Sequence, residues 1–67
     1  MIKSKLKVML ATREMTQKEL AQRTGVRPPT ISAIATNTIK ELPISVLDKI
    51  CKELNCNVGD LFEYVED

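Results

Sequence analysis

The stretch Thr16–Ile34, TQKELAQRTGVRPPTISAI, decides how this chain folds, because it contains the start and the end of one helix and the start of another. Thr16 and Glu19 have the spacing of a capping box, in which the threonine hydroxyl accepts from the glutamate amide and the carboxylate accepts from the threonine amide. Gly25 fits the position with left-handed backbone conformation that commonly ends a helix. The stretch therefore predicts a helix that begins at Thr16, ends at Gly25 and buries Leu20.

A second helix is predicted from about Pro28 to Thr36, and it opens with two prolines. Proline is tolerated in the first turn because the amide hydrogens there lack intrahelical partners and because its fixed φ already suits a helix. At 100° per residue, Ile31, Ile34 and Ala35 share one face. Neither this helix nor the three residues after it contain a charged residue, so its outer face is suited to close contact with another surface. The small uncharged residues of that face are Pro29, Ala33 and Thr36, flanked by Thr30, Ser32 and Asn37.

Three further helices are predicted from apolar residues at helical spacing. The first covers residues 2–12, the fourth begins near Pro43 and ends at Asn55, and the fifth is capped by Asn57 and continues through GDLFEYVED, residues 59–67. No segment alternates with a period of two over a useful length. The predicted fold class is therefore all-α, as one compact five-helix domain over residues 1–67. The apolar residues assigned to these three helices are Ile2, Leu6, Met9, Leu10, Ile44, Leu47, Ile50, Cys51, Leu54, Val58, Leu61, Phe62 and Val65.

The composition fits one small globular domain, with 67 residues of which 43% are hydrophobic. No apolar run is long enough for a membrane span or the core of a signal peptide, so we expect a cytoplasmic protein. Two cysteines, Cys51 and Cys56, without any histidine, provide neither a disulfide framework nor a zinc site. We expect no metal and no cofactor, and we expect Cys51 to act as a small buried hydrophobic residue.

The charges are separated along the chain although the net charge is only +1. Residues 1–40 contain eight basic and two acidic residues, whereas residues 41–67 contain two basic and seven acidic ones, so the two parts carry +6 and −5. A polyanion would therefore approach the N-terminal two thirds and be repelled by the C-terminal third. The simpler interpretation is that an acidic tail only keeps a small protein soluble.

Residues 16–34 resemble the helix-turn-helix of the Cro-type phage-repressor family, also called the XRE family. That family begins the motif with Thr or Ser followed by Gln, and continues with Glu-Leu-Ala, a turn glycine and an Ile-Ser pair. The chain has Thr16-Gln17, Glu19-Leu20-Ala21, Gly25 and Ile31-Ser32 at these places. The resemblance implies a five-helix DNA-binding domain in which helices two and three form the motif, the third enters the major groove and the second crosses the DNA backbone. The implied function is that of a sequence-specific transcriptional regulator, a repressor or an operon autoregulator.

The resemblance also implies which residues meet DNA. Gln17 would contact a phosphate at the positive end of the second helix. Among the other basic residues near this helix, Arg13 and Lys18 are better placed for phosphates than the lysines of the first helix, while Arg23 either is solvated or pairs with Glu19. The predicted DNA-binding residues are Gln17, Lys18, Arg27, Pro28, Pro29, Thr30, Ser32, Ala33, Thr36, Asn37 and Lys40.

Base recognition is expected to be unusual in this chain. Family members often read bases with Gln, Asn or Arg at positions that are Pro28, Pro29 and Ala33 here, and these side chains cannot form bidentate hydrogen bonds. We hypothesise that Arg27, Thr30 and Ser32 read bases while Pro29 and Ala33 contact thymine methyl groups. The alternative is that the third helix provides only close approach and that DNA shape supplies the selectivity. The family often has glycine where this chain has Glu14, which predicts some strain in that turn.

Two other roles compete with DNA binding. A protein-interaction module could retain the helix-turn-helix scaffold and bind a protein through its uncharged third helix, because a fold does not fix a function. An enzyme is disfavoured, since the chain has no histidine, no phosphate-binding glycine loop and little room for a pocket. No small-molecule ligand is evident. Repressors of this class commonly bind paired half-sites, so we predict a homodimer with Tyr64 and Val65 at its interface.

Overall fold

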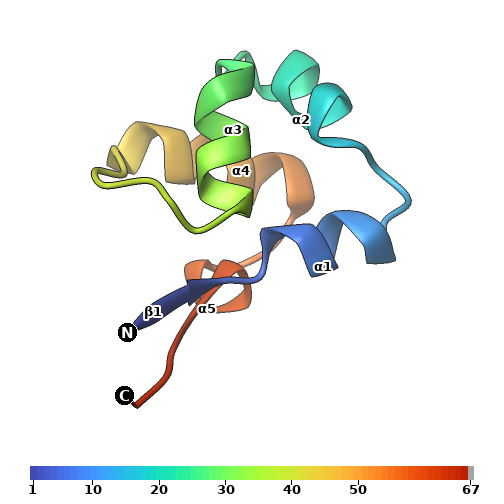
Figure 1. Ribbon diagram of the computed structural model, residues 1–67. Helices are drawn as coiled ribbons and strands as arrows, with labels where there is room; N and C mark the ends of the chain where they lie inside the picture. The colour runs from blue at the N-terminus through green and yellow to red at the C-terminus, as the bar shows by residue number, and fades with distance from the viewer. Residues whose placement is uncertain (67) are drawn as a thin grey trace.

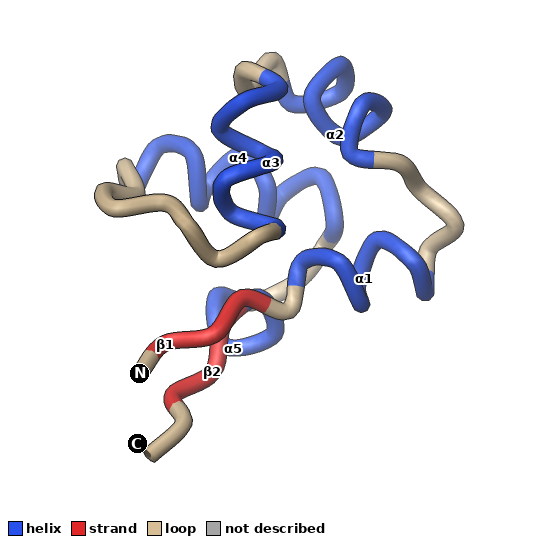
Figure 2. The backbone as a smooth tube through the Cα atoms, viewed as in Figure 1, coloured by secondary structure: helices blue, strands red, loops and turns tan. Residues whose placement is uncertain are grey.

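The computed structural model describes residues 1–66 and contains five helices and a small two-stranded ribbon (Figures 1 and 2). The five predicted helices are therefore confirmed, whereas the all-α class is only approximate. No helix in the described part of the chain has the length and apolarity needed to cross a membrane. In chain order the elements are β1 (Ile2–Ser4), α1 (Leu6–Thr12), α2 (Gln17–Thr24), α3 (Pro28–Ala35), α4 (Ile44–Leu54), α5 (Val58–Leu61) and β2 (Phe62–Tyr64).

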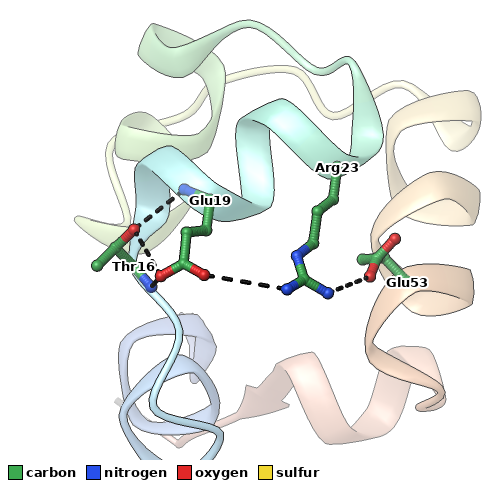
Figure 3. A network of polar contacts seen from close by, with 4 residues as sticks. All are labelled: Thr16, Glu19, Arg23 and Glu53. Atoms are coloured by element: carbon green, nitrogen blue, oxygen red, sulfur yellow. Dashed lines mark hydrogen bonds and ion pairs between the residues drawn. The ribbon is translucent and has the colours of Figure 1, made fainter.

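The ends of α2 and the start of α3 agree with the predictions made from their sequence. The Glu19 amide donates to the Thr16 hydroxyl at 3.0 Å, and the Thr16 amide donates to Glu19 Oε1 at 3.2 Å, which completes the capping box (Figure 3). Gly25 ends the helix with a φ of +76°. Arg27 is the extended N-cap residue of α3, and the helix begins with the two prolines.

The core draws one or more side chains from every helix, which explains how a short chain holds five helices together. Twelve apolar residues form it, with Met15, Ile39 and Leu42 among those packed around its edge. Because α3 contributes fully buried side chains on one face, its opposite face is left for solvent or a ligand. The six large side chains that are almost completely buried are Leu6, Leu20, Ile31, Ile34, Ile50 and Leu61.

The two ends of the chain form β1 and β2, so the predictions of a helix from Ile2 and of a last helix reaching Val65 were wrong. The strands are antiparallel, with Ile2 opposite Tyr64. The pairing extends beyond the strands, because the Val65 amide donates to the Met1 carbonyl at 2.8 Å. Each strand is only three residues long, too short for a pattern of period two, and its partner lies at the far end of the sequence. Asp67, the end of the predicted last helix, lies outside the described residues.

The apolar stripe of α4 is less buried than predicted at three positions, Ile44, Cys51 and the half-buried Leu47. Ile44 begins the helix after the N-cap Pro43 and is 82% exposed, because a first-turn residue there extends beyond the edge of the core. Cys51 is half-buried rather than fully buried and packs against the core. The helix ends as expected at Asn55, which has a φ of +50°.

The end of α4 is a Schellman turn that brings the two cysteines together. The amide of Cys56 donates to the carbonyl of Cys51 at 3.0 Å, and the amide of Asn55 donates to the carbonyl of Lys52 at 3.4 Å. A side-chain contact between the first and last residues of this turn commonly accompanies it. Burial raises the pKa of the Cys56 thiol, and the hydrogen bond and charge of Cys51 raise it further. Both thiols are free.

Candidate nucleic-acid interface

The face of α3 opposite the core is exposed and uncharged. Pro29, Ser32 and Thr36 are exposed on it, and Thr30 and Ala33 are partly exposed. The Thr36 hydroxyl donates to the Ser32 carbonyl one turn earlier, at 2.9 Å. The last turn of the helix is therefore satisfied within the protein, and the face has no buried polar group that requires a protein partner.

A groove of about 580 Å³ runs along this face, between α3 and the segment that follows it. It brings together four of the predicted DNA-binding residues, namely Pro29, Thr30, Ala33 and Lys40. Thr38 and Glu41 also line the groove, but the sequence did not predict them. They lie in an irregular loop, whose path depends on packing and not on a repeating spacing of apolar residues. The complete lining is Pro29, Thr30, Ala33, Thr38, Ile39, Lys40, Glu41, Pro43 and Val46.

The positive end of α2 lies at the start of the motif. Thr16 caps Glu19, so the amides of Gln17 and Lys18 are the first-turn donors for which the helix supplies no partner. Gln17 is partly exposed and Lys18 is exposed. This end of α2 therefore has the donors and the partial positive charge that an anion requires.

The basic residues of the N-terminal part divide into two groups. Some hold the fold together: Arg13 Nη2 donates to the Leu54 carbonyl at the end of α4 at 2.9 Å, and Lys5 Nζ donates to the Gly59 carbonyl at 3.2 Å. The expectation that Arg13 is well placed for a phosphate missed this contact, because Leu54 is 41 residues away in sequence. The second group consists of three exposed cations of the motif region. Within residues 1–66, the side chains of Lys18, Arg27 and Lys40 form no hydrogen bond or ion pair.

Arg23 belongs to the structural group. Its guanidinium lies 4.0 Å from the Glu19 carboxylate and 3.5 Å from the Glu53 carboxylate of α4 (Figure 3). Of the two predicted alternatives for Arg23, solvation or pairing with Glu19, the structure shows the pairing. All three side chains are partly solvated, so each ion pair contributes little to stability. Their main effect is to occupy Arg23, the basic residue in the last turn of α2.

Asn37 has a structural role that the sequence did not reveal. It has a φ of +62°, and its side chain bridges to β1. Ser4 donates its amide to Asn37 Oδ1 at 3.0 Å, and Asn37 Nδ2 donates to the Ile2 carbonyl at 3.1 Å. The amide group thus occupies the outer edge of β1, and the prediction that Asn37 contacts DNA rests on its place in the loop rather than on a free side chain.

The consecutive helices α2 and α3, the glycine turn between them and the exposed face of α3 define a helix-turn-helix protein. The family model of the Cro/C1-type HTH DNA-binding domain matches residues 5–67, and the chain belongs to this family. It is a DNA-binding transcriptional regulator.

The chain is similar to two known transcriptional regulators. The chain is 40% identical over 60 residues to the HTH-type transcriptional regulator YozG of Bacillus subtilis (strain 168), and the match covers 90% of this chain and 71% of YozG. Its fold is similar to the crystal structure of the transcriptional regulator VanUg, with a TM-score of 0.79 and 28% identity over 98% of this chain and 87% of VanUg. The likeness to VanUg therefore extends over the ends of the chain as well as the motif.

Proposed function

We propose that this regulator binds specific sites on duplex DNA with α3 in the major groove, and that it acts as a repressor or an operon autoregulator. One observation carries the proposal: the uncharged outer face of α3 lies beside a groove and is flanked by two uncommitted cations, Arg27 and Lys40. A helix with a smooth face can approach the base edges closely, while cations on either side meet the phosphates. Binding to duplex DNA supports the expectation of a cytoplasmic protein.

The phosphate contacts are assigned to both sides of α3. Gln17 and Lys18 would meet one backbone through the first-turn amides of α2, and Lys40 would meet the other from the loop after α3. The Asn37 backbone lies in that loop, and Thr36 ends the helix beside it. Contacts of this kind hold the protein in register and carry no sequence information themselves.

Base selection is assigned to the start and middle of α3. Arg27 is the one long side chain with several donors at this end of the helix, and Thr30 and Ser32 add hydroxyls. Pro28 and Pro29 fix the helix start, and the carbon atoms of Pro29 and Ala33 are suited to contact with thymine methyl groups. The preferred sites should therefore contain thymines beneath α3.

The first test is selection of bound sites from random duplex DNA at two salt concentrations. We expect a thymine-containing consensus, and an affinity that falls as salt rises because bound counterions are released. Arg27→Ala should cost about 1 to 3 kcal/mol in binding to the selected site and should relax one base position. Ser45→Ala, an exposed change at the start of α4, is the control. Selected sites without any thymine preference, together with an Ala33→Gln variant that selects the same sites, would refute the base-contact assignment.

The second candidate function is a protein-interaction module that binds a protein through the uncharged outer face of α3, which is exposed. The salt dependence separates the two functions. Binding to DNA weakens steeply with salt, whereas an apolar contact between proteins does not. Membership of a DNA-binding family supports a regulator rather than an enzyme.

A homodimer is part of the proposal, because paired half-sites match a protein with two-fold symmetry. Tyr64, one of the two residues predicted at the interface, is 70% exposed. Val65, the other, is half-buried and bonded through its backbone to Met1. Sedimentation of the free protein and of its DNA complex measures this state directly.

A further inference from the structure

The two cysteines of the chain lie at the two ends of the turn that closes α4. Both thiols are free, and both side chains are half-buried rather than sealed in the core. The groove beside α3 is lined by other residues, so the proposed DNA contacts make no use of the thiols. The chain therefore holds a pair of nucleophilic groups for which DNA binding supplies no role.

The Schellman turn limits the distance between the two cysteines. The Cys56 amide nitrogen lies 3.0 Å from the Cys51 carbonyl oxygen. The amide nitrogen is about 1.5 Å, and the carbonyl oxygen about 2.4 Å, from the Cα atom of its own residue, so the two Cα atoms are at most about 7 Å apart. A disulfide can join cysteines up to this separation. The turn therefore permits a bond between the two residues without opening.

The side chains of the two cysteines converge. The Cys56 thiol and the Cys51 sulfur share a hydrogen bond, which places the two sulfur atoms in contact. The residues at these two places of a Schellman turn commonly touch through their side chains, and here both side chains are thiols. Cysteines can be joined only when their Cβ atoms point toward each other. The backbone and the side chains of the pair thus meet both geometric requirements of a disulfide.

Cys51 is the thiol that a small molecule reaches first. The described residues that line a hollow of about 320 Å³ include Cys51 but not Cys56. A water molecule takes up roughly 30 Å³ in the liquid, so the hollow has room for hydrogen peroxide. The sequence predicted Cys51 to be a small buried hydrophobic residue, whereas its place at the hollow leaves the sulfur accessible. The other residues of the lining are Ile44, Leu47, Asp48 and Val58.

We propose that Cys51 and Cys56 form a reversible thiol oxidation site, at which hydrogen peroxide converts the two thiols to one intrachain disulfide. First, the Cys51 thiolate attacks a peroxide oxygen, an S–O bond forms, the O–O bond breaks, and the departing hydroxide takes up the proton that Cys51 released. Second, the Cys56 sulfur attacks the sulfur of this sulfenic acid, the S–S bond forms, and the hydroxyl group leaves with the Cys56 proton as water. The two sulfur atoms are oxidised, and the peroxide is reduced to two water molecules.

The surroundings of the pair favour this order of steps. Burial, Cys51 and the charge of Asp60 raise the pKa of Cys56, and only the Arg13 guanidinium acts in the opposite direction. Cys56 therefore keeps its proton at neutral pH and is the second thiol to react. A sulfenic acid on Cys51 forms against a thiol that condenses with it. Such condensation protects the sulfur from irreversible oxidation.

The disulfide should act on the stability of the fold. It closes the turn directly before Asn57, the N-cap residue of α5, and so joins the end of α4 to the start of the last helix. A disulfide restrains the unfolded chain, and the restraint is smallest for a short loop. We therefore expect the oxidised chain to unfold at a moderately higher temperature than the reduced one. In a reducing compartment a bond of this kind is transient.

The test treats the folded full chain with hydrogen peroxide and follows its mass. We expect a monomer that has lost two hydrogen atoms and no longer reacts with an alkylating reagent, and dithiothreitol should restore both thiols. In Cys56→Ser, oxidation should stop at the sulfenic acid of Cys51, which a cyclic 1,3-dione captures. Cys51→Ser is the matched variant with the same replacement, and it should form that adduct at least tenfold more slowly because its remaining thiol lies outside the hollow.

Three results would overturn the inference. One is a native chain that accumulates sulfinic acid, or that forms disulfides only between two chains. Another is equal rates of adduct formation in the two serine variants, since Cys51 would then not be the first thiol to react. The third is an oxidised chain that unfolds at a lower temperature than the reduced chain, because the bond would then strain the turn. Circular dichroism checks the fold of each variant, and none of these measurements depends on DNA binding.

Discussion

At the scale of the residue, two left-handed positions have opposite consequences for stability. Glu14 and Asn37 both have positive φ values, +53° and +62°. Glu14 has only a backbone role in its turn, since its amide donates to the Ala11 carbonyl. Asn37 adds two side-chain hydrogen bonds to β1. The same substitution at the two positions therefore separates backbone strain from side-chain bonding.

We expect Glu14→Gly to raise the free energy of unfolding by up to about 1 kcal/mol, because glycine adopts positive φ without a steric cost. Asn37→Gly receives a smaller relief, because asparagine tolerates positive φ better than glutamate does, and it loses two hydrogen bonds, so it should lower that free energy by about 1 kcal/mol. Urea denaturation measures both. Equal effects of the same sign would mean that the bridge from Asn37 to β1 contributes nothing.

At the scale of the element, the end of α4 is held by contacts that couple it to the rest of the fold. Arg13 donates to the last carbonyl of the helix, where a cation also complements the helix dipole. The Schellman turn then brings Cys56 onto Cys51. The sequence placed the end of this helix correctly at Asn55, but its partner Arg13, the residue after α1, became visible only in three dimensions.

The raised pKa of Cys56 predicts a loss of stability in alkaline solution. Above the ordinary pKa of a thiol the unfolded chain releases this proton while the folded chain keeps it, so the free energy of unfolding falls as pH rises. The contribution is fully present below the ordinary thiol pKa and is lost as pH passes the raised one. Cys56→Ser should show a shallower decline between neutral and alkaline pH in thermal unfolding. An identical decline in both proteins would exclude Cys56 as its source.

At the scale of the whole molecule, a core of twelve residues leaves little reserve of stability. A 67-residue domain is expected to have a free energy of unfolding of about 3 to 10 kcal/mol. Leu20→Ala, which empties a fully buried site on α2, should cost about 2 to 5 kcal/mol. We expect this variant to be partly unfolded at 37 °C by circular dichroism. A change of less than about 1 kcal/mol would mean that the site can collapse around the cavity.

The ribbon formed by β1 and β2 also matters for the stability of the whole molecule, because it joins the two ends of the chain. A two-stranded ribbon is only marginally stable by itself. This one is supported by α5, by the Asn37 side chain and by the hydrogen bond that the Lys5 backbone amide donates to the Leu61 carbonyl. It also sets Ile2 directly opposite Tyr64. A helix at either end, as the local periodicity favoured, would not have brought Ile2 and Tyr64 together.

The sequence by itself determined α2, its turn and α3, since the capping box at Thr16, the glycine at position 25 and the paired prolines act within a few residues of each other. It also determined which face of α3 is free of charge, because helical periodicity is a local property. Only the tertiary structure decided the strand pairing of the termini, the partners of Arg13 and Asn37 and the exposure of Ile44. Each of these depends on residues brought together by packing of the core, and no local pattern of three or four residues encodes such a distant neighbour.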